Sequence, residues 1–71
     1  MTIEHSVTNS SQIFHLSYDE IEQRLTITYH NGQKYAYMNV PRELFDKLIV
    51  AESAGKFLNS EIKNKFKYEK I

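Results

Sequence analysis

Two tyrosines in the stretch QKYAY at residues 33–37 carry the first candidate chemistry. The spacing of Tyr35 and Tyr37 places both rings on one side of a β-strand, because successive strand side chains point to opposite faces. An exposed tyrosine offers a flat apolar surface ending in a hydroxyl, on which a nucleobase can stack. The alternative is that a second copy of the chain or a mobile tail covers these rings.

A second candidate group surrounds residue 55 and consists of Ser53, Gly55, Lys56, Asn59 and Lys63. We place Ser53, Gly55 and Lys56 at the start of a helix, where free backbone N–H groups and a lysine charge attract a phosphate. Asn59 and Lys63 follow Lys56 at helical spacing, so they extend the same face. The alternative is that Ser53 only caps the helix and Gly55 only makes a turn.

Metal binding and catalysis find little support in the sequence. His5, His15 and His30 lack the close spacing of metal ligands, and the chain has no cysteine, so we expect neither a metal nor a cofactor. We also find no acid pair beside a nucleophile and no glycine-rich phosphate loop. The sequence therefore predicts a protein that is not an enzyme.

Three segments alternate between apolar and polar residues and predict β-strands: 13–18, 25–29 and 33–40. In the first segment, Phe14, Leu16 and Tyr18 fall on one side. Between the second and third, Asn31-Gly32 is typical of a two-residue type I′ turn.

A two-residue turn would pair Ile27 with Ala36 and Thr28 with Tyr35. Leu25, Ile27, Ala36 and Met38 then share the core face. Tyr35 and Tyr37 lie on the opposite, polar face, which we expect to hold Thr26, Thr28, His30 and His15 as well. The tyrosines and the lysines would meet at one ligand only around the sheet edge or across a subunit boundary.

Helical spacing follows the strands. Val40-Pro41 starts a helix whose apolar residues run to Ala51, a second helix covers about residues 55–64, and residues 66–71 form an extended tail. We therefore expect an α+β fold, a three-stranded antiparallel sheet of order β-β-β-α-α with two helices packed on one face. Residues 1–10 are expected to be a flexible N-terminal arm, and residues 11–71 a single domain.

Size and charge limit the partners. A chain of 71 residues buries only about 60% of its unfolded surface, which favours support by self-association. The net charge is zero, but residues 1–53 carry four basic and seven acidic side chains, and residues 54–71 carry five lysines and two glutamates. The sequence contains neither a membrane-spanning stretch nor a signal peptide, so we expect a cytoplasmic protein without membrane contact.

Several of these features together resemble the KTSC domain family. They are Ser11, Ile13, SYD at 17–19, Leu25, Ile27, Tyr35-x-Tyr37, Val40-Pro41 and the stretch AESAGKFLNSEIKNKFKYEKI at 51–71. The family occurs at the C-terminus of some lysyl-tRNA synthetases and alone in bacterial and phage proteins, and the resemblance implies RNA binding. Ala54 and Lys63 replace a lysine and an arginine that are common in the family.

The sequence thus predicts a homo-oligomeric, non-catalytic binding protein for small phosphate-bearing nucleotides, which could sequester a signalling (cyclic) nucleotide. The candidate ligand-binding residues are Tyr35, Tyr37, Ser53, Gly55, Lys56, Asn59 and Lys63. An RNA-binding module and a protein-interaction domain are the alternatives.

Overall fold

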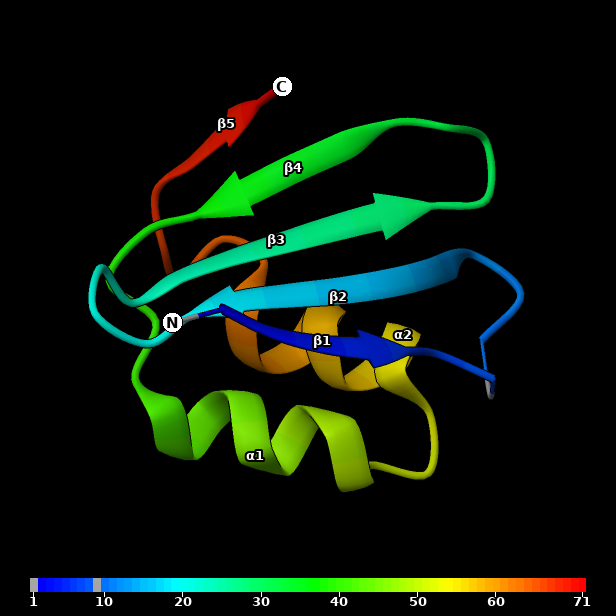
Figure 1. Cartoon of the computed structure of the whole chain (residues 1–71). Helices are drawn as coiled ribbons and strands as arrows, with labels where there is room; N and C mark the ends of the chain where they lie inside the picture. The colour runs from blue at the N-terminus through cyan, green and yellow to red at the C-terminus, as the bar shows by residue number, and fades with distance from the viewer. Residues whose placement is uncertain (1, 9) are drawn as a thin grey trace.

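The computed structural model describes residues 2–8 and 10–71 and has one antiparallel sheet with helices on one face (Figure 1). Its elements are β1 (Thr2–Ser6), β2 (Ile13–Asp19), β3 (Arg24–Tyr29), β4 (Lys34–Tyr37), α1 (Arg42–Val50), α2 (Ala54–Phe57), the π-helical η1 (Leu58–Ile62) and β5 (Tyr68–Lys70). The strands lie in the order β1-β2-β3-β4-β5. The predicted α+β class is confirmed. Within the described part of the chain, no helix is long and apolar enough to span a bilayer.

The sheet has five strands and not the three that the sequence predicts. The expected flexible arm contains β1, which pairs with β2 from Thr2 opposite Asp19 to Ser6 opposite His15. Met1 and Asn9, which also belong to that arm, lie outside the described residues. The expected tail contains β5, which pairs with β4 at the other edge. β5 is exposed at every residue, and β1 has Ile3 as its one strongly apolar residue, although its burial alternates. Neither sequence therefore shows the repeated apolar–polar alternation that predicts a half-buried strand.

The predicted register of the β3–β4 hairpin is wrong by one residue. Its loop has three residues, because the Tyr29 N–H donates to the Gln33 carbonyl at 2.8 Å, and Gly32 alone in this loop has a positive φ, +89°. Such a loop is a type I turn followed by a left-handed glycine. Thr26 consequently faces Ala36, and Ile27 faces Tyr35.

This one-residue shift moves the tyrosines to the other face of the sheet. Tyr35 and Tyr37 lie beside Ile27 and Leu25 on the face that the helices cover, whereas Ala36 lies beside Thr26 on the outer face. Leu25 and Ile27 are fully buried, as predicted.

A bulge in β2 places Phe14 on a different face from the one that the sequence predicts. The β2–β3 register shifts between Ile13 and His15, so Phe14 has no partner opposite it. Ile13 is therefore buried with Leu16 and Tyr18, and Phe14 is 56% exposed.

The core forms where the helices meet the sheet. Phe45 of α1 stacks on Tyr18 of β2 with ring centroids 4.8 Å apart and an interplanar angle of 10°. The buried Tyr18 hydroxyl donates to the Val40 carbonyl at 2.6 Å. This hydrogen bond ties β2 to the segment that leads into α1. Leu58 and Ile62 bring η1 against the same core.

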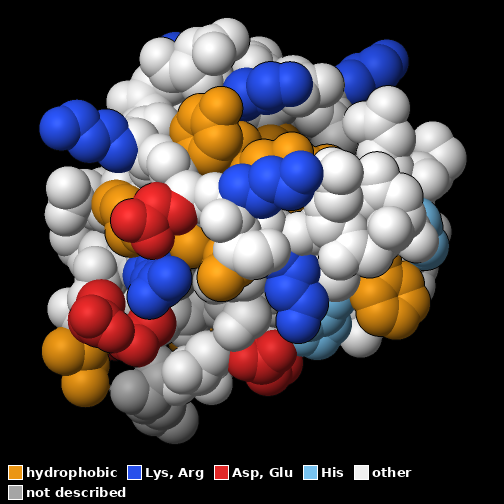
Figure 2. Space-filling view, turned by 90° about the horizontal axis from the view of Figure 1, so that it is seen from above, with side chains coloured by type: hydrophobic (Ala, Val, Ile, Leu, Met, Phe, Trp, Pro, Cys, Tyr) orange, Lys and Arg blue, Asp and Glu red, His pale blue; other side chains and the backbone are white. Residues whose placement is uncertain are grey.

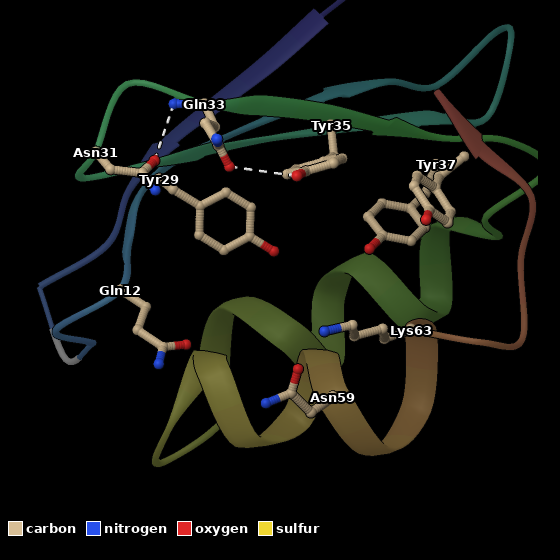
Figure 3. A pocket seen from close by; sticks show the side chains of 9 residues that line it. Gln12, Tyr29, Asn31, Gln33, Tyr35, Tyr37, Asn59 and Lys63 are labelled. Atoms are coloured by element: carbon tan, nitrogen blue, oxygen red, sulfur yellow. Dashed lines mark hydrogen bonds between the residues drawn. The ribbon is translucent and has the colours of Figure 1, made fainter. Parts of the chain in front are cut away.

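The second predicted helix is present, in two parts. The Ser53 hydroxyl caps α2 by accepting from the Lys56 N–H at 3.4 Å. The helix then widens into η1 and ends where the Lys63 N–H donates to the Leu58 carbonyl at 2.8 Å. Lys63 thus stands at the end of η1, facing the sheet (Figure 3).

Candidate functional site

A cavity of about 330 Å³ opens between the sheet and the second helix. We call it the tyrosine cavity, and its walls are Gln12, Tyr29, Asn31, Gln33, Tyr35, Tyr37, Asn59, Lys63 and Tyr68. Figure 3 shows Tyr29, Tyr35 and Tyr37 on the sheet side of the cavity and the side chains of Asn59 and Lys63 on its helical side. The corrected register makes this arrangement possible, because it places the tyrosines on the helix face.

Four aromatic rings form one side of the cavity. Tyr35 meets Tyr29 edge to face with ring centroids 5.6 Å apart, and Tyr68 at 5.8 Å. Tyr68 also packs on Tyr37 at 5.4 Å. Such contacts fix the rings relative to one another.

Polar groups surround these aromatic rings. The Tyr35 hydroxyl donates to Gln33 Oε1 at 3.3 Å, and Asn31 Oδ1 accepts from the Gln33 N–H at 3.0 Å. Gln12 and Asn59 add two more amides, and each amide offers both donors and an acceptor. Lys63 supplies a positive charge, and within residues 2–8 and 10–71 none of the ion pairs involves it. The cavity therefore combines stacking surfaces, hydrogen-bonding amides and one cation.

Ser53, Gly55 and Lys56 lie around an adjoining hollow of about 320 Å³, which we call the Lys56 groove. Its walls are Ser10, Ser11, Gln12, Ser53, Gly55, Lys56 and Asn59. The hydroxyl oxygens of Ser10 and Ser53 already accept hydrogen bonds from the backbone. Ser10 accepts from the N–H groups of Gln12 and Ile13, and Ser53 accepts from the N–H group of Lys56. Among the described residues that line this groove, Lys56 is the only one with a charged side chain.

The structure thus brings four of the seven predicted site residues into one cavity, namely Tyr35, Tyr37, Asn59 and Lys63. The other three line the neighbouring groove. Residues that the sequence interpretation missed complete the tyrosine cavity: Gln12, Tyr29, Asn31, Gln33 and Tyr68. The alternation of residues 25–29 already predicts that Tyr29 lies on the same face as Leu25 and Ile27. With the correct hairpin register, Tyr35 lies on that face too, so the sequence could have predicted that the two tyrosines line one site.

Burial changes the acidity of two cavity tyrosines. It raises the pKa of Tyr29 to about 12, with smaller contributions from the neighbouring Tyr37 and Tyr35. Burial also raises the pKa of Tyr37, with help from Tyr68 and Tyr35. Both hydroxyls therefore remain neutral hydrogen-bond donors throughout the physiological pH range.

We expect Tyr29→Phe to make the protein less sensitive to alkali. The unfolded phenol titrates near pH 10, whereas the folded one titrates at about 12. The stability that this group contributes is thus fully present below about pH 10 and is lost as the pH rises toward 12. Urea unfolding at several pH values should show a shallower alkaline loss in Tyr29→Phe than in the wild type. Equal losses in the two proteins would contradict the raised pKa.

The outer face of the sheet has a different composition. His15 Nε2 lies 2.6 Å from Glu4 Oε1, and the Ser17 hydroxyl donates to Glu4 Oε2 at 2.7 Å. His15 therefore does not share a face with the tyrosines, contrary to the predicted register. No cluster of three or more His, Asp or Glu side chains suited to a metal ion occurs in the described residues.

The C-terminal segment that includes β5 is rich in lysine. Seen from above, the surface carries several separate Lys and Arg side chains with hydrophobic ones between them, while the acidic side chains lie mainly lower in the view (Figure 2). The segment from 63 to 70 contains Lys63, Lys65, Lys67 and Lys70. The tyrosine cavity is therefore next to the most basic part of the chain.

Comparison with known proteins identifies the family. The family model of the KTSC domain matches residues 9–66. The chain belongs to the KTSC family. A KTSC domain protein of Yersinia pestis has a crystal structure with a TM-score of 0.90, 32% sequence identity, and coverage of 100% of this chain and 99% of its own. This confirms the resemblance found in the sequence.

KTSC relatives include both small and long proteins. A protein of Tsukamurella paurometabola is 43% identical over 58 residues, which are 82% of this chain and 87% of that protein. Lysine–tRNA ligase of Nostoc punctiforme is 39% identical over 61 residues, or 86% of this chain and 11% of the ligase. Lysine–tRNA ligase of Trichormus variabilis is 37% identical over 54 residues, or 76% of this chain and 10% of the ligase. In the two ligases the KTSC domain is thus a minor part of the chain.

Proposed function

We propose that this chain is a non-catalytic binding protein for small phosphate-bearing nucleotides. The observation that carries the proposal is that the tyrosines of the sheet and Lys63 of the helix line one cavity. A base would stack on the rings, the amides of Gln12 and Asn59 would hydrogen-bond its edge, and the Lys63 ammonium group would bind the phosphate. The cavity is close to the lower limit of about 300 Å³ for ligand pockets, which suits a small ligand.

The chemistry of the walls supports binding without catalysis. The described residues that line the tyrosine cavity are tyrosines, amides and one lysine. General bases are most often His and otherwise Asp, Glu, Lys, Tyr or Cys, and of these only Lys and Tyr are among the described lining residues. The raised pKa values of Tyr29 and Tyr37 keep both hydroxyls protonated near neutral pH, which disfavours them as bases. In this proposal the protein could act by sequestering a signalling nucleotide, linear or cyclic. Its cytoplasmic location stays a prediction.

Titration calorimetry with nucleoside monophosphates of each base tests the proposal. Hydrogen bonds to charged groups contribute about 1.5–3 kcal/mol, so Lys63→Ala should weaken binding roughly tenfold or more at low salt. The loss should shrink as salt rises, because salt screens an exposed charge but not stacking. Lys47→Ala, which removes a lysine of α1, is the matched control and should change nothing. Nucleotide recovered after denaturing the complex should be chemically unchanged. Absence of saturable binding by any nucleotide would contradict the proposal.

RNA binding is the second candidate, favoured by the basic segment beside the cavity and by the lysine–tRNA ligase relatives. Single-stranded RNA binding weakens with salt at a slope of about −0.7 per phosphate contacted. A short oligonucleotide with a slope of several units would favour RNA. A slope near one, equal to that of the mononucleotide, would favour the small-ligand proposal.

We also propose that the protein forms a homo-oligomer. The uncovered tyrosine face expected from the sequence does not support this, since the helices cover that face. The edges of the sheet support oligomerisation instead. β1 and β5 form these two edges, and an open sheet edge favours association with another chain. Light scattering at micromolar concentration should give a mass above that of one chain. The mass of a single chain would contradict oligomerisation and leave nucleotide binding untouched.

A further inference from the structure

The tyrosine cavity and the Lys56 groove share two walls. Gln12 and Asn59 line both spaces, so the two hollows adjoin at these amide side chains. Gly55 lines the groove beyond them, where an added Cβ would make an ordinary contact of 3.4 Å with the Ser10 hydroxyl oxygen. A ligand seated on the tyrosines can therefore continue past Asn59 into the groove.

The volumes of the two hollows indicate a ligand made of two small parts, one in each hollow. The tyrosine cavity measures about 330 Å³ and the groove about 320 Å³. Each is near the lower limit of roughly 300 Å³ for ligand pockets. Each space thus suits a small unit, and the two together suit a ligand about twice that size.

The charges also come in two places. Lys63 lines the tyrosine cavity and not the groove, whereas Lys56 lines the groove and not the cavity. Seven residues separate them, which corresponds to a distance on the order of 10 Å along a helix axis. One phosphate at Lys63 would therefore leave Lys56 available for a second.

A third hollow also adjoins the tyrosine cavity, at Gln12, Tyr29 and Asn31, but its described walls lack a lysine or arginine. Its walls are Ser11, Gln12, Tyr29, His30 and Asn31, with no lysine or arginine among the described residues. A ligand with a second phosphate is therefore directed toward Lys56 and not toward His30.

We infer that the site takes ligands of the dinucleotide class, with one base on the tyrosines, one phosphate at Lys63 and a second phosphate at Lys56. This inference rests on the proposed nucleotide-binding function. It adds that the ligand spans both hollows and that Lys56 recognises only its second part. Mononucleotides would occupy the tyrosine cavity alone.

The test compares nucleoside 5′-monophosphates with the corresponding 5′-phosphorylated dinucleotides by calorimetry. The dinucleotide should bind at least tenfold tighter to the wild type. Lys56→Ala should remove most of that gain and change mononucleotide affinity less than twofold, whereas Lys63→Ala should weaken both ligands. Lys47→Ala is the control for loss of charge, and circular dichroism checks the fold of each variant.

Amide NMR of the wild type provides a second measurement that needs no variant. The Gly55 and Lys56 resonances should shift with the dinucleotide and remain in place with the mononucleotide. Equal affinities for both ligands, or a dinucleotide gain that survives Lys56→Ala, would overturn the inference and leave the proposed function standing. Failure of every nucleotide to bind would overturn both.

Discussion

Phe45→Ala is expected to lower the free energy of unfolding by about 3–5 kcal/mol, the usual range for removing a buried phenylalanine ring. Phe45 is fully buried and stacks on Tyr18 at 4.8 Å, so it holds α1 against the sheet. A domain of this size has a total stability of roughly 4–11 kcal/mol at 0.05–0.15 kcal/mol per residue. If the total lies at the lower end of this range, the loss leaves part of the population unfolded at 37 °C.

Urea denaturation followed by circular dichroism measures this effect. Lys47→Ala is the control on the same helix, because Lys47 is exposed, and it should change stability by less than about 0.5 kcal/mol. A Phe45→Ala protein within 1 kcal/mol of the wild type would contradict the packing of α1 on Tyr18. This result would not bear directly on the tyrosine cavity, because the helical residues that line it are Asn59 and Lys63 and not residues of α1.

Tyr35→Ala is expected to weaken nucleotide binding by a factor of roughly 5–150, because stacking of one base on an aromatic side chain contributes about 1–3 kcal/mol. Tyr35 is half-buried and lies between Tyr29 and Tyr68 in the aromatic wall. Tyr37 is a poorer choice, because it is only 3% exposed and its truncation would also damage the core. The register predicted from the sequence placed Tyr37 on the open polar face, and its burial opposite Leu25 corrects that expectation.

The matched control is Tyr35→Phe, which keeps the ring and loses only the hydroxyl bonded to Gln33. Calorimetry should show near wild-type affinity for Tyr35→Phe and the full loss for Tyr35→Ala. If both variants lose affinity equally, the hydroxyl and not stacking recognises the ligand. Unchanged affinity in folded Tyr35→Ala would contradict base stacking at this position.

The sequence predicted the central strands and both helices because their apolar residues repeat at strand or helix spacing. Leu25 and Ile27 are buried on alternate positions of β3, and Phe45 and Leu48 lie one helical turn apart on α1. It did not predict β1 and β5. Edge strands expose most of their side chains, so their composition is that of an arm or a tail.

The hairpin error had the largest consequence for the site. Asn31-Gly32 is compatible with a two-residue turn and with a three-residue loop, and the choice depends on whether Asn31 adopts a positive φ. It does not, and only Gly32 does so within this loop. Because side chains alternate along a strand, this difference decided whether Tyr35 and Tyr37 face away from Lys63 or toward it.

The most direct test of the proposed site is an NMR titration with the tightest-binding nucleoside monophosphate. Saturable shifts should appear in the ring signals of Tyr29 and Tyr35 and in the side-chain signals of Asn59 and Lys63, which line the cavity. Signals of Thr26 on the outer face should stay in place. Shifts confined to the outer face, or no shift at any cavity residue at saturating nucleotide, would contradict nucleotide binding in the tyrosine cavity.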